Sequence, residues 1–553
     1  MIGRLAIPMI VIVALVLSAC SGGQPQTGTG SPAPSAAATG AALPTGETPK
    51  PGGELTFIVT AEPPSFDGHS QNTFAMLHYT APHYSLLYRL DPADLTKIVP
   101  DVAADMPQIS ADKLVWTIPI RKDVKFHSGQ QLTSADVLAT YNKIVFPPSG
   151  VTSTRQAVYG VVDKIEAPDA STIKFTLKYP SASFQASLAS PWNFVYSADK
   201  LKTDIHWYEK NVDGTGPFVF VEYQKGAFWS GKKNPDYFVK GRPYLDSFKA
   251  IVVSDTNRQT TAIQSKQAMI EFRGFTPQQR DTLSRALGQD LAIQEAPWIC
   301  TNYVAFNTKK KPFDDERVRR ALSLAVDRWA GGEALSKTTI VKDVGGLMRP
   351  KGPYAMSDAD LVKIPGFGKD AKAAKDEAKK LLADAGASSL SFKFLNRNVT
   401  TPYEPVALYL MDQWKQVGVT VTHDVKETAT YQADLRNGNF EVGLDFNCDY
   451  FDEPDLQLAK FVSATGAGKG LNFSFYEDKK LDDMILAQSK ETDPAKRKQM
   501  VGDIERYAMG EKAYQWPVLW WYRIIPYLAL VRGWKVGSNH YTNQDLVSIW
   551  LAK

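Results

Sequence analysis

The chain has 553 residues, of which 44% are hydrophobic and 22% are charged, and its formal net charge is +4. These proportions are typical of a soluble globular body, and so small a positive charge does not favour nucleic-acid binding. Three cysteines are too few for a disulfide framework. The sequence does not decide whether Cys300 and Cys448 pair, and we expect them to remain unpaired.

The first twenty residues predict export. Arg4 precedes an apolar run, Leu5 to Leu17, that is too short to span a bilayer comfortably and is typical of a secretory signal peptide. The run ends in Leu17-Ser18-Ala19-Cys20, which resembles the bacterial lipobox. The resemblance implies that residues 1–19 are cleaved and that a lipid on Cys20 anchors the protein. The alternative is an ordinary signal peptide whose cysteine is incidental.

Residues 20–51 predict a flexible tether. After Cys20 the segment is nearly all Gly, Ser, Thr, Ala, Pro and Gln, and it contains no aromatic residue. Such a composition cannot bury enough surface to offset the entropy of ordering. The globular body therefore starts near Gly52, and the roughly five hundred residues that follow allow about two to four domains.

The first half of the body predicts strands joined by stiff turns. Residues 54–60 alternate as a strand and stop at Pro63-Pro64, where two prolines prevent further pairing. Residues 115–120 predict a second strand. Thr133 and Asp136 then form a capping box for a helix. The bend at residues 214–217 leads into a further strand at 218–223.

The second half predicts strands alternating with helices. The acidic residues of 314–316 start a helix whose inner face reaches Trp329, since negative charge is favourable at a helix N-terminus. Helical spacing over 374–385 and 407–414 is followed by Gly386 and Gly418 as stops. Strands at 392–394 and 419–421 complete a strand-helix-strand order, which implies a parallel sheet covered by helices.

Read together, six blocks of the body resemble the extracellular solute-binding proteins of the dipeptide and oligopeptide ABC importer family, family 5. They fall in the family's order and span essentially the whole body. The blocks are Gly52-Gly53-Glu54-Leu55-Thr56 with Glu62-Pro63-Pro64-Ser65-Phe66-Asp67, Trp116 through Gly129, Leu132 to Val137, Gly214 to Phe218 with Val221-Glu222-Tyr223, Asn234-Pro235-Asp236-Tyr237, and Pro312 to Arg319 with Ala325 to Arg328.

The resemblance implies an α/β fold of the periplasmic-binding-protein type, class II, with two lobes that close on a ligand. The larger lobe would carry an extra inserted domain. Domain I would comprise 52–85, 214–298 and 516–553, domain II 86–213, and domain III, the second lobe, 299–515. The two chain crossings near residues 298–307 and 515–521 would form the hinge.

The same resemblance implies a receptor that binds a di- or oligopeptide and delivers it to an ABC permease. It implies a monomer without cofactor or metal, and not an enzyme. Peptide-binding members pair the ligand's amino terminus with an aspartate, which corresponds here to Asp449 beside Tyr450. One extra residue separates this pair from Glu453-Pro454, and the register is open. The alternative is that residues 445–455 form a solvated acidic loop.

Other candidates for ligand contact lie at strand ends and near the crossings. Arg397, beside Asn396 at the end of a predicted strand, could take a ligand carboxylate bidentately. Large aromatic side chains suit a ligand pocket, although core packing is an equal alternative for each. The aromatic candidates are Phe66, Trp298, Trp520 and Trp521.

Three alternatives to a peptide receptor are open. Oligosaccharides, opines or metal complexes are alternative ligands for the same fold, and many tryptophans would suit a sugar. A secreted enzyme is disfavoured because the chain has no metalloprotease, serine-hydrolase or Cys-x-x-Cys motif, and residues 465–470 lack the glycine and the Ser or Thr of a phosphate loop. His69, His78 and His83 could hold a metal only if the fold brought them together.

Overall fold

The computed structural model describes residues 47–464 and 471–552. The signal sequence, Cys20, most of the tether and the glycine-rich segment at 465–470 lie outside the described residues, and the predictions for them stay predictions. Residues 47–51 form neither helix nor strand. None of the helices in these two ranges has the length and apolar character needed to cross a membrane.

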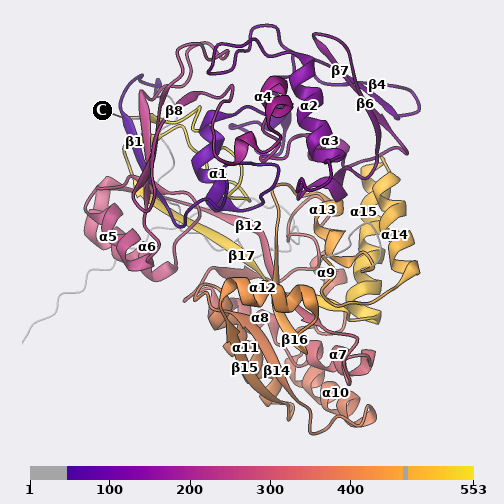
Figure 1. The fold of residues 1–553 in the computed structure, drawn as a ribbon. Coiled ribbons are helices and arrows are strands. Elements are labelled where there is room, and N and C mark those ends of the chain that lie inside the picture. Colours follow the sequence, from indigo (N-terminus) through magenta and orange to yellow (C-terminus); the bar gives the residue numbers. More distant parts are fainter. Residues whose placement is uncertain (1–46, 465–470, 553) are drawn as a thin grey trace, which may run out of the picture. The chain divides into compact units, whose positions relative to one another are not determined.

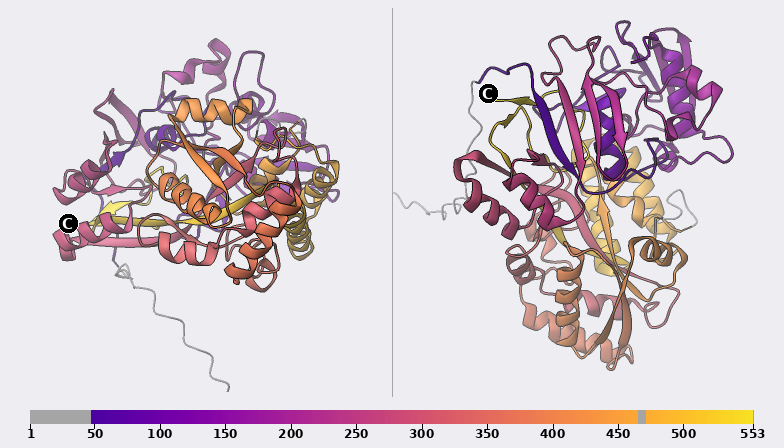
Figure 2. Two further views of the ribbon diagram at one scale, coloured as in Figure 1. Left: turned by 90° about the horizontal axis from the view of Figure 1, so that it is seen from below. Right: turned by 60° about the vertical axis from the view of Figure 1, so that its left-hand side comes forward.

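The first sheet joins a strand from the start of the body to strands from residues 218–271. Its order is β11-β1-β10-β9-β8. β1 (Glu54–Val59) runs parallel to β10 (Ser247–Val252), and the right-hand view of Figure 2 shows indigo β1 beside the magenta strands. Leu55 and Phe57, two positions apart on one face, are buried in the core below. The other strands are β8 (Phe218–Gln224), β9 (Phe228–Lys233) and β11 (Ile270–Glu271).

The second sheet has the order β4-β5-β7-β6 and packs against α2 (Ser134–Val145). The predicted capping box is confirmed, since Thr133 and Asp136 satisfy each other's backbone amides at the start of α2. Its strands and the neighbouring hairpin are β4 (Gln108–Ile109), β5 (Val115–Pro119), β6 (Val162–Asp169), β7 (Thr172–Leu177), β2 (Tyr88–Leu90) and β3 (Ile98–Pro100).

The third sheet has the order β13-β17-β12-β16-β14-β15. β12 (Leu291–Phe306) and β17 (Gln515–Leu528) run side by side in antiparallel pairing, as Figure 1 shows. Their register shifts twice between Pro297 and Tyr303, within the predicted first crossing. The other strands are β13 (Val341–Asp343), β14 (Ser391–Arg397), β15 (Thr420–Lys426) and β16 (Val442–Cys448). Two further strands, β18 (Val531–Arg532) and β19 (Trp550–Leu551), pair with each other.

The predicted strand-helix-strand unit is confirmed. β14 and β15 pair in parallel, and α11 (Tyr403–Lys415) connects them. Gly386 and Gly418 follow the two predicted helices with φ of +69° and +88°, a region that glycine enters without the steric cost of a side chain. The single helix predicted to reach Trp329 is wrong. It ends at Leu324, and the Asp327 carboxylate accepts from the Ala330 amide to start a second helix.

The remaining helices cover the sheets or connect them. Those before β12 are α1 (Phe74–Thr80), α3 (Phe184–Leu188), α4 (Ala198–Thr203), α5 (Thr256–Gln264) and α6 (Pro277–Leu287). Those after it are α7 (Glu316–Leu324), α8 (Arg328–Leu335), α9 (Asp358–Leu361), α10 (Ala371–Asp384), α12 (Thr428–Asn437), α13 (Pro454–Leu458), α14 (Lys479–Lys490) and α15 (Pro494–Glu505), the last continuing into a π-helical turn, Arg506–Glu511.

Candidate functional site

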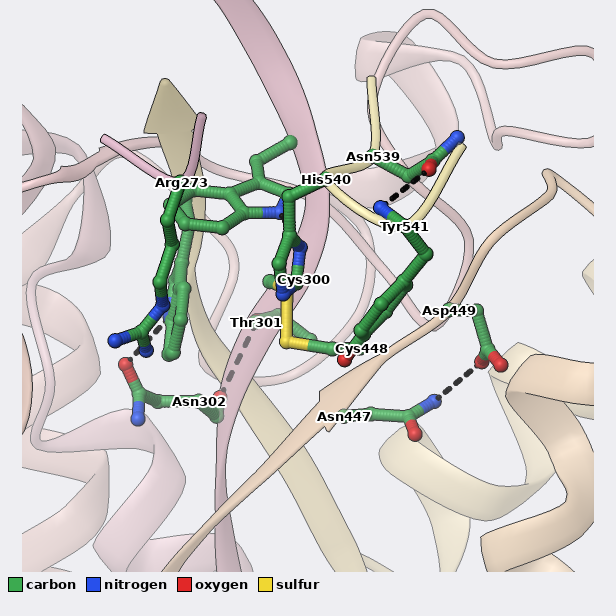
Figure 3. Close-up of a disulfide and its surroundings, with 12 residues drawn as sticks. Arg273, Cys300, Thr301, Asn302, Asn447, Cys448, Asp449, Asn539, His540 and Tyr541 are labelled. Atoms are coloured by element: carbon green, nitrogen blue, oxygen red, sulfur yellow. Dashed lines mark hydrogen bonds between the residues drawn. A yellow bond between two sulfur atoms is a disulfide. The ribbon is translucent and has the colours of Figure 1, made fainter. Parts of the chain in front are cut away.

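The predicted ligand segment follows directly after β16, at the centre of the third sheet. The Asp449 amide donates to the carbonyl of Ile299 on β12 at 3.0 Å. The Asn447 side-chain amide contacts the Asp449 carboxylate at 3.5 Å, as Figure 3 shows. The backbone of Asp449 is therefore held against β12 while its carboxylate has one weak neutral partner.

Cys300 and Cys448 form a disulfide, and our expectation that they remain unpaired was wrong. The cysteines lie directly opposite each other in the β12–β16 ladder, with their Cα atoms 4.1 Å apart. Sequence alone could not reveal this register because 148 residues separate them. The bridge fixes the position of Asp449, which is the next residue along the chain.

The Asp449 carboxyl has a raised pKa. Burial raises its pKa to about 8, and the charge of Lys460 and the contact from Asn447 oppose that rise only in part. Lys460 itself forms an ion pair with Asp445. Within the described residues, Asp449 has no basic side chain at ion-pair distance. Its carboxylate is therefore free to pair with the cationic group of a ligand.

The other acidic residues of this segment are not a solvated loop, which excludes that alternative. Asp445 and Glu453 are 1% and 5% exposed. Each carboxylate has a protein partner. The pairs are Asp445 with Lys460, Asp452 with Arg349 at 2.6 Å, Glu453 with Arg497, and Asp455 with Arg497 at 3.4 Å and with the Ser183 hydroxyl. Asp449 is the member of this group that lacks a charged partner.

Tyr450 connects three segments of the chain. Its hydroxyl donates to the carbonyl of Ala186 at 3.3 Å, and its own carbonyl accepts from Asn539 at 2.9 Å. Its ring packs edge-on against Trp192. Residues 450–492 touch residues 113–192 at further points, including Lys113 with Thr492 at 2.6 Å. The predicted ligand residue Tyr450 therefore lies where these two regions meet.

Asn396 and Arg397 are the last two residues of β14, whereas we expected them in the loop that follows the strand. The Arg397 Nε donates to the Thr428 hydroxyl at 2.9 Å, and the guanidinium lies 5.6 Å from the centre of the Tyr403 ring. It forms no ion pair within the described residues. Asn396 is 1% exposed, and its amide faces the Tyr403 carbonyl and His423. Arg397 thus keeps an uncompensated charge, whereas the Asn396 side chain is already bonded.

The predicted aromatic residues pack largely within the protein. Trp298, Trp520 and Trp521 are at most 2% exposed, and each indole N–H already donates to a protein acceptor. Trp298 and Trp521 meet edge to face beside the disulfide. Phe66 packs edge-on against Trp229 in the core of the first sheet. Their contact with a ligand stays a prediction.

Several side chains near Asp449 were missed by sequence reasoning. Arg273, Asn302 and Tyr541 come from a loop, from β12 and from the C-terminal segment, and Figure 3 draws them around the disulfide. The one feature of the sequence that points to Arg273 is its position just after the strand β11. Nothing in the local sequence connects it with residues more than 150 positions away.

Residues 97–469 match the family described as "Bacterial extracellular solute-binding proteins, family 5 Middle". The chain belongs to this family. This family 5 protein therefore works on the extracellular or periplasmic side of the membrane.

Relatives and solved structures agree with this assignment. The chain is 27% identical to "Di/tripeptide-binding protein 2" of Pseudomonas aeruginosa, with 82% of this chain and 87% of the relative covered. It is 24% identical to "Oligopeptide-binding protein AppA" of Bacillus subtilis, with 99% and 98% covered.

Two solved structures with TM-scores of 0.78 each share 22% identity with it and cover 91% of this chain and 99% of their own. They are DppA of Helicobacter pylori with peptide STSA and AgaA of A. tumefaciens R10 with agropinic acid. The two-lobed α/β fold predicted from the sequence is confirmed.

Two larger cavities of this family 5 protein lie away from Asp449. One of about 370 Å³ is lined by Arg280 and Tyr522 among others, and one of about 480 Å³ includes Arg89 and Trp550. Arg280 pairs there with Asp281 and Glu295, and Arg89 pairs with Asp545, whereas Lys342 and Arg242 lie over the rings of Tyr522 and Tyr244.

The histidines do not form a metal site. His69 and His83 contact the carbonyls of Phe194 and Phe218, and His78 lies between aromatic rings. Within residues 47–464 and 471–552, no three His, Cys, Asp or Glu side chains are grouped so that they could hold a metal ion. Burial lowers the pKa of all three imidazoles, which therefore act as neutral core groups.

Proposed function

We propose that this protein is a lipid-anchored receptor that captures a di- or oligopeptide by lobe closure and passes it to an ABC import permease. One observation carries the proposal. Asp449 is a buried carboxyl with a pKa near 8 and no basic partner among the described residues. The empty protein keeps this carboxyl protonated, and the ammonium group of a peptide would supply the counter-charge that its ionised form needs.

The relatives support a peptide rather than a sugar. Their names specify di- and tripeptides, oligopeptides and glutathione. Ligands in the similar structures include the peptide STSA, Met-Leu and a nonapeptide, besides agropinic acid. Oligosaccharides and metal complexes have no comparable support, and an opine remains the alternative ligand to test.

We further propose the domain division given above, with 86–213 inserted into a first domain built from 52–85, 214–298 and 516–553, and with 299–515 as the second lobe. The pairing of β1 with β10 across that insertion supports it. The shifted register of β12 against β17 at residues 297–303 supports a hinge there, since a disrupted ladder bends more easily than a regular one.

The anchor and the partners complete the proposal. A lipid on Cys20 and the tether at 20–51 would keep a diffusing monomer near its permease, and ligand would be released unchanged rather than converted. Cys20→Ala tests the anchor. We expect metabolic labelling with a radioactive fatty acid to mark the wild type and not the variant, and fractionation to move the variant from membrane to soluble fractions.

Ligand class is tested with the purified body, residues 52–553. Pools of peptides, oligosaccharides and opines are added separately while melting temperature is followed, because a ligand at 100 times its Kd stabilises the folded state by about 2.7 kcal/mol. We expect the peptide pool to raise the melting temperature and Asp449→Ala to abolish the rise. A rise with oligosaccharides or opines alone would show that the ligand is not a peptide.

A further inference from the structure

The cavity of about 480 Å³ lies where distant segments of the chain meet. Its wall comes from Pro49, from residues between 89 and 121, from 237–244 and from 533–550. Four side chains of the wall carry aromatic rings, those of Tyr237, Phe238, Tyr244 and Trp550. A concave site with aromatic walls and a few polar groups is typical of ligand binding. Asp449 is not part of this wall, so the cavity is separate from the proposed peptide site.

Arg242 brings an uncompensated charge to the cavity. Its guanidinium lies 3.9 Å from the centre of the Tyr244 ring, and the residue is half-buried. It forms neither a hydrogen bond nor an ion pair with any described residue. Stacking on a ring holds a guanidinium in one orientation and leaves its five planar donors free. A guanidinium presented in this way binds the oxygens of a phosphate or carboxylate in pairs.

Further donors of the wall are unused. The hydroxyls of Tyr237 and Tyr244 and the indole N–H of Trp550 form no hydrogen bond with a described residue. None of these atoms is sealed in the core, so solvent reaches them. The cavity therefore offers several neutral donors beside one cationic donor, which is the chemistry that an anion requires.

The other charged groups of the wall are engaged within the protein. Asp91 and Asp101 accept hydrogen bonds from backbone amides, each at 2.8 Å. The two other arginines form ion pairs, which are Arg89 with Asp545 at 2.6 Å and Arg121 with Asp123 at 2.7 Å. Among the three arginines of the wall, Arg242 is thus the one without a carboxylate partner in the described part of the chain.

An exposed turn borders the cavity next to Arg242. The Arg242 amide donates to the Val239 carbonyl at 3.1 Å, and Gly241 has a φ of +76°, which a glycine adopts without steric cost. Val239 is 38% exposed, and Lys240 is exposed without a hydrogen bond or ion pair to a described residue. An apolar side chain flanked by basic ones favours the surface of an anionic membrane.

The chain that leads to the proposed anchor enters the body at this cavity. Pro49 belongs to the wall, and the Gly52 amide donates at 2.8 Å to the carbonyl of Tyr244, the residue that carries Arg242 on its ring. Even fully extended, the residues from Cys20 to Pro49 reach at most about 100 Å. A lipid on Cys20 would therefore keep this face of the body within reach of the membrane surface.

We propose that this cavity receives the phosphate of an anionic phospholipid headgroup, with Arg242 donating paired hydrogen bonds to it and Val239 and Lys240 contacting the membrane surface. This goes beyond the proposed function and rests on its lipid anchor, not on its peptide ligand. A lipid on a tether limits distance alone. A second contact on the body would also orient the receptor relative to the membrane.

The test uses the mature chain, residues 20–553, with Cys20→Ala, so that no lipid of its own attaches it. Vesicles of phosphatidylcholine alone, and of phosphatidylcholine and phosphatidylglycerol in equal parts, are sedimented with this parent chain. The same is done with Arg242→Gln, Arg242→Lys, Lys240→Gln and the control Arg285→Gln, an exposed arginine on α6 outside the wall. Circular dichroism checks that each variant folds.

We expect the parent chain to bind the vesicles that contain phosphatidylglycerol and not those of phosphatidylcholine alone. Arg242→Gln and Lys240→Gln should each weaken binding about fivefold, the factor for one basic residue at an anionic surface. Arg242→Lys should lose less than Arg242→Gln, because the charge remains while the paired donors are gone. Arg285→Gln should bind like the parent chain.

Equal binding to both kinds of vesicle, or no binding to either, would overturn the headgroup site. An equal loss in Arg242→Gln and Arg285→Gln would overturn it as well, since attraction would then come from overall charge. Calorimetric binding of soluble glycerol phosphate without vesicle binding would exclude the membrane as the source of the phosphate. Lys240 is exposed and makes no bond, so Lys240→Gln remains decisive even if Arg242→Gln does not fold.

Failure of the proposed function can be told apart from failure of this inference. A peptide-induced rise in melting temperature reports the peptide site, and we expect the Arg242 and Lys240 variants to keep that rise unchanged. Vesicle binding without a peptide response would leave the headgroup site standing and refute the peptide receptor. A peptide response without vesicle binding would do the reverse.

Discussion

Replacing Asp449 with Asn should stabilise the empty protein in a pH-dependent way. The folded state raises the pKa of this carboxyl from 3.8 to about 8, chiefly through burial. The unfolded chain ionises the group near pH 4, whereas the folded chain keeps it protonated until about pH 8. Between these values the folded state binds the extra proton, so wild-type stability falls as pH rises.

The size of the effect follows from the shift. About four pH units at roughly 1.4 kcal/mol each give about 6 kcal/mol as the upper figure. The carboxyl is not fully covered, and water that reaches it lowers the cost. We therefore expect Asp449→Asn to gain about 2 kcal/mol over the wild type at pH 8 and nothing at pH 4. Its peptide affinity should fall, because the amide carries no charge for the ammonium.

Urea denaturation of both proteins at pH 4.5, 6, 7 and 8 measures the difference. Asp483→Asn, at an exposed carboxylate on α14, is the matched control and should show no pH-dependent gain. A gain from Asp449→Asn that is the same at every pH, or no gain at pH 8, would refute the reasoning, because Asp449 would then titrate normally in the folded state.

Three other perturbations should be measurable. Replacing Cys300 and Cys448 with Ala should lower the free energy of unfolding by about 2–4 kcal/mol, seen in urea titrations, and a reducing agent should then have no further effect. Arg497→Met should cost about 3–5 kcal/mol in the same assay, because it leaves the buried Glu453 without its partner. Ser183→Ala removes the hydrogen bond from the Ser183 hydroxyl to the Asp455 carboxylate. We expect it to weaken peptide affinity, measured by calorimetry, about tenfold or less and to leave the ligand preference unaltered.

Local patterns predicted the secondary structure of the body well. The capping box at Thr133, the glycine stops at Gly386 and Gly418 and the parallel pair β14–β15 depend on residues close together in the chain. Local interactions decide such features, so they can be predicted directly from the sequence. The exception was the end of α7, where Asp327 can cap a new helix as readily as it can sit inside a long one.

The site itself was predicted only in part. Asp449 was found through the segment that resembles the aspartate segment of peptide-binding family members, and Arg397 through its place near the end of a predicted strand; neither forms an ion pair within the described residues. The tryptophans were proposed from their size, yet the fold uses their N–H groups internally. Size and aromaticity suit a core and a pocket equally, so composition could not separate the two.

The sequence by itself predicted an export signal, which stays a prediction, and it determined the family and the alternation of strands and helices, since motifs and periodicity depend on residues near one another. The tertiary structure alone decided that Cys300 bonds to Cys448 and that the acids around Asp449 have charged partners, whereas Asp449 has none among the described residues. Pairing and burial depend on contacts between distant segments. The register of β12 against β16 and β17 creates those contacts, and no local pattern records it.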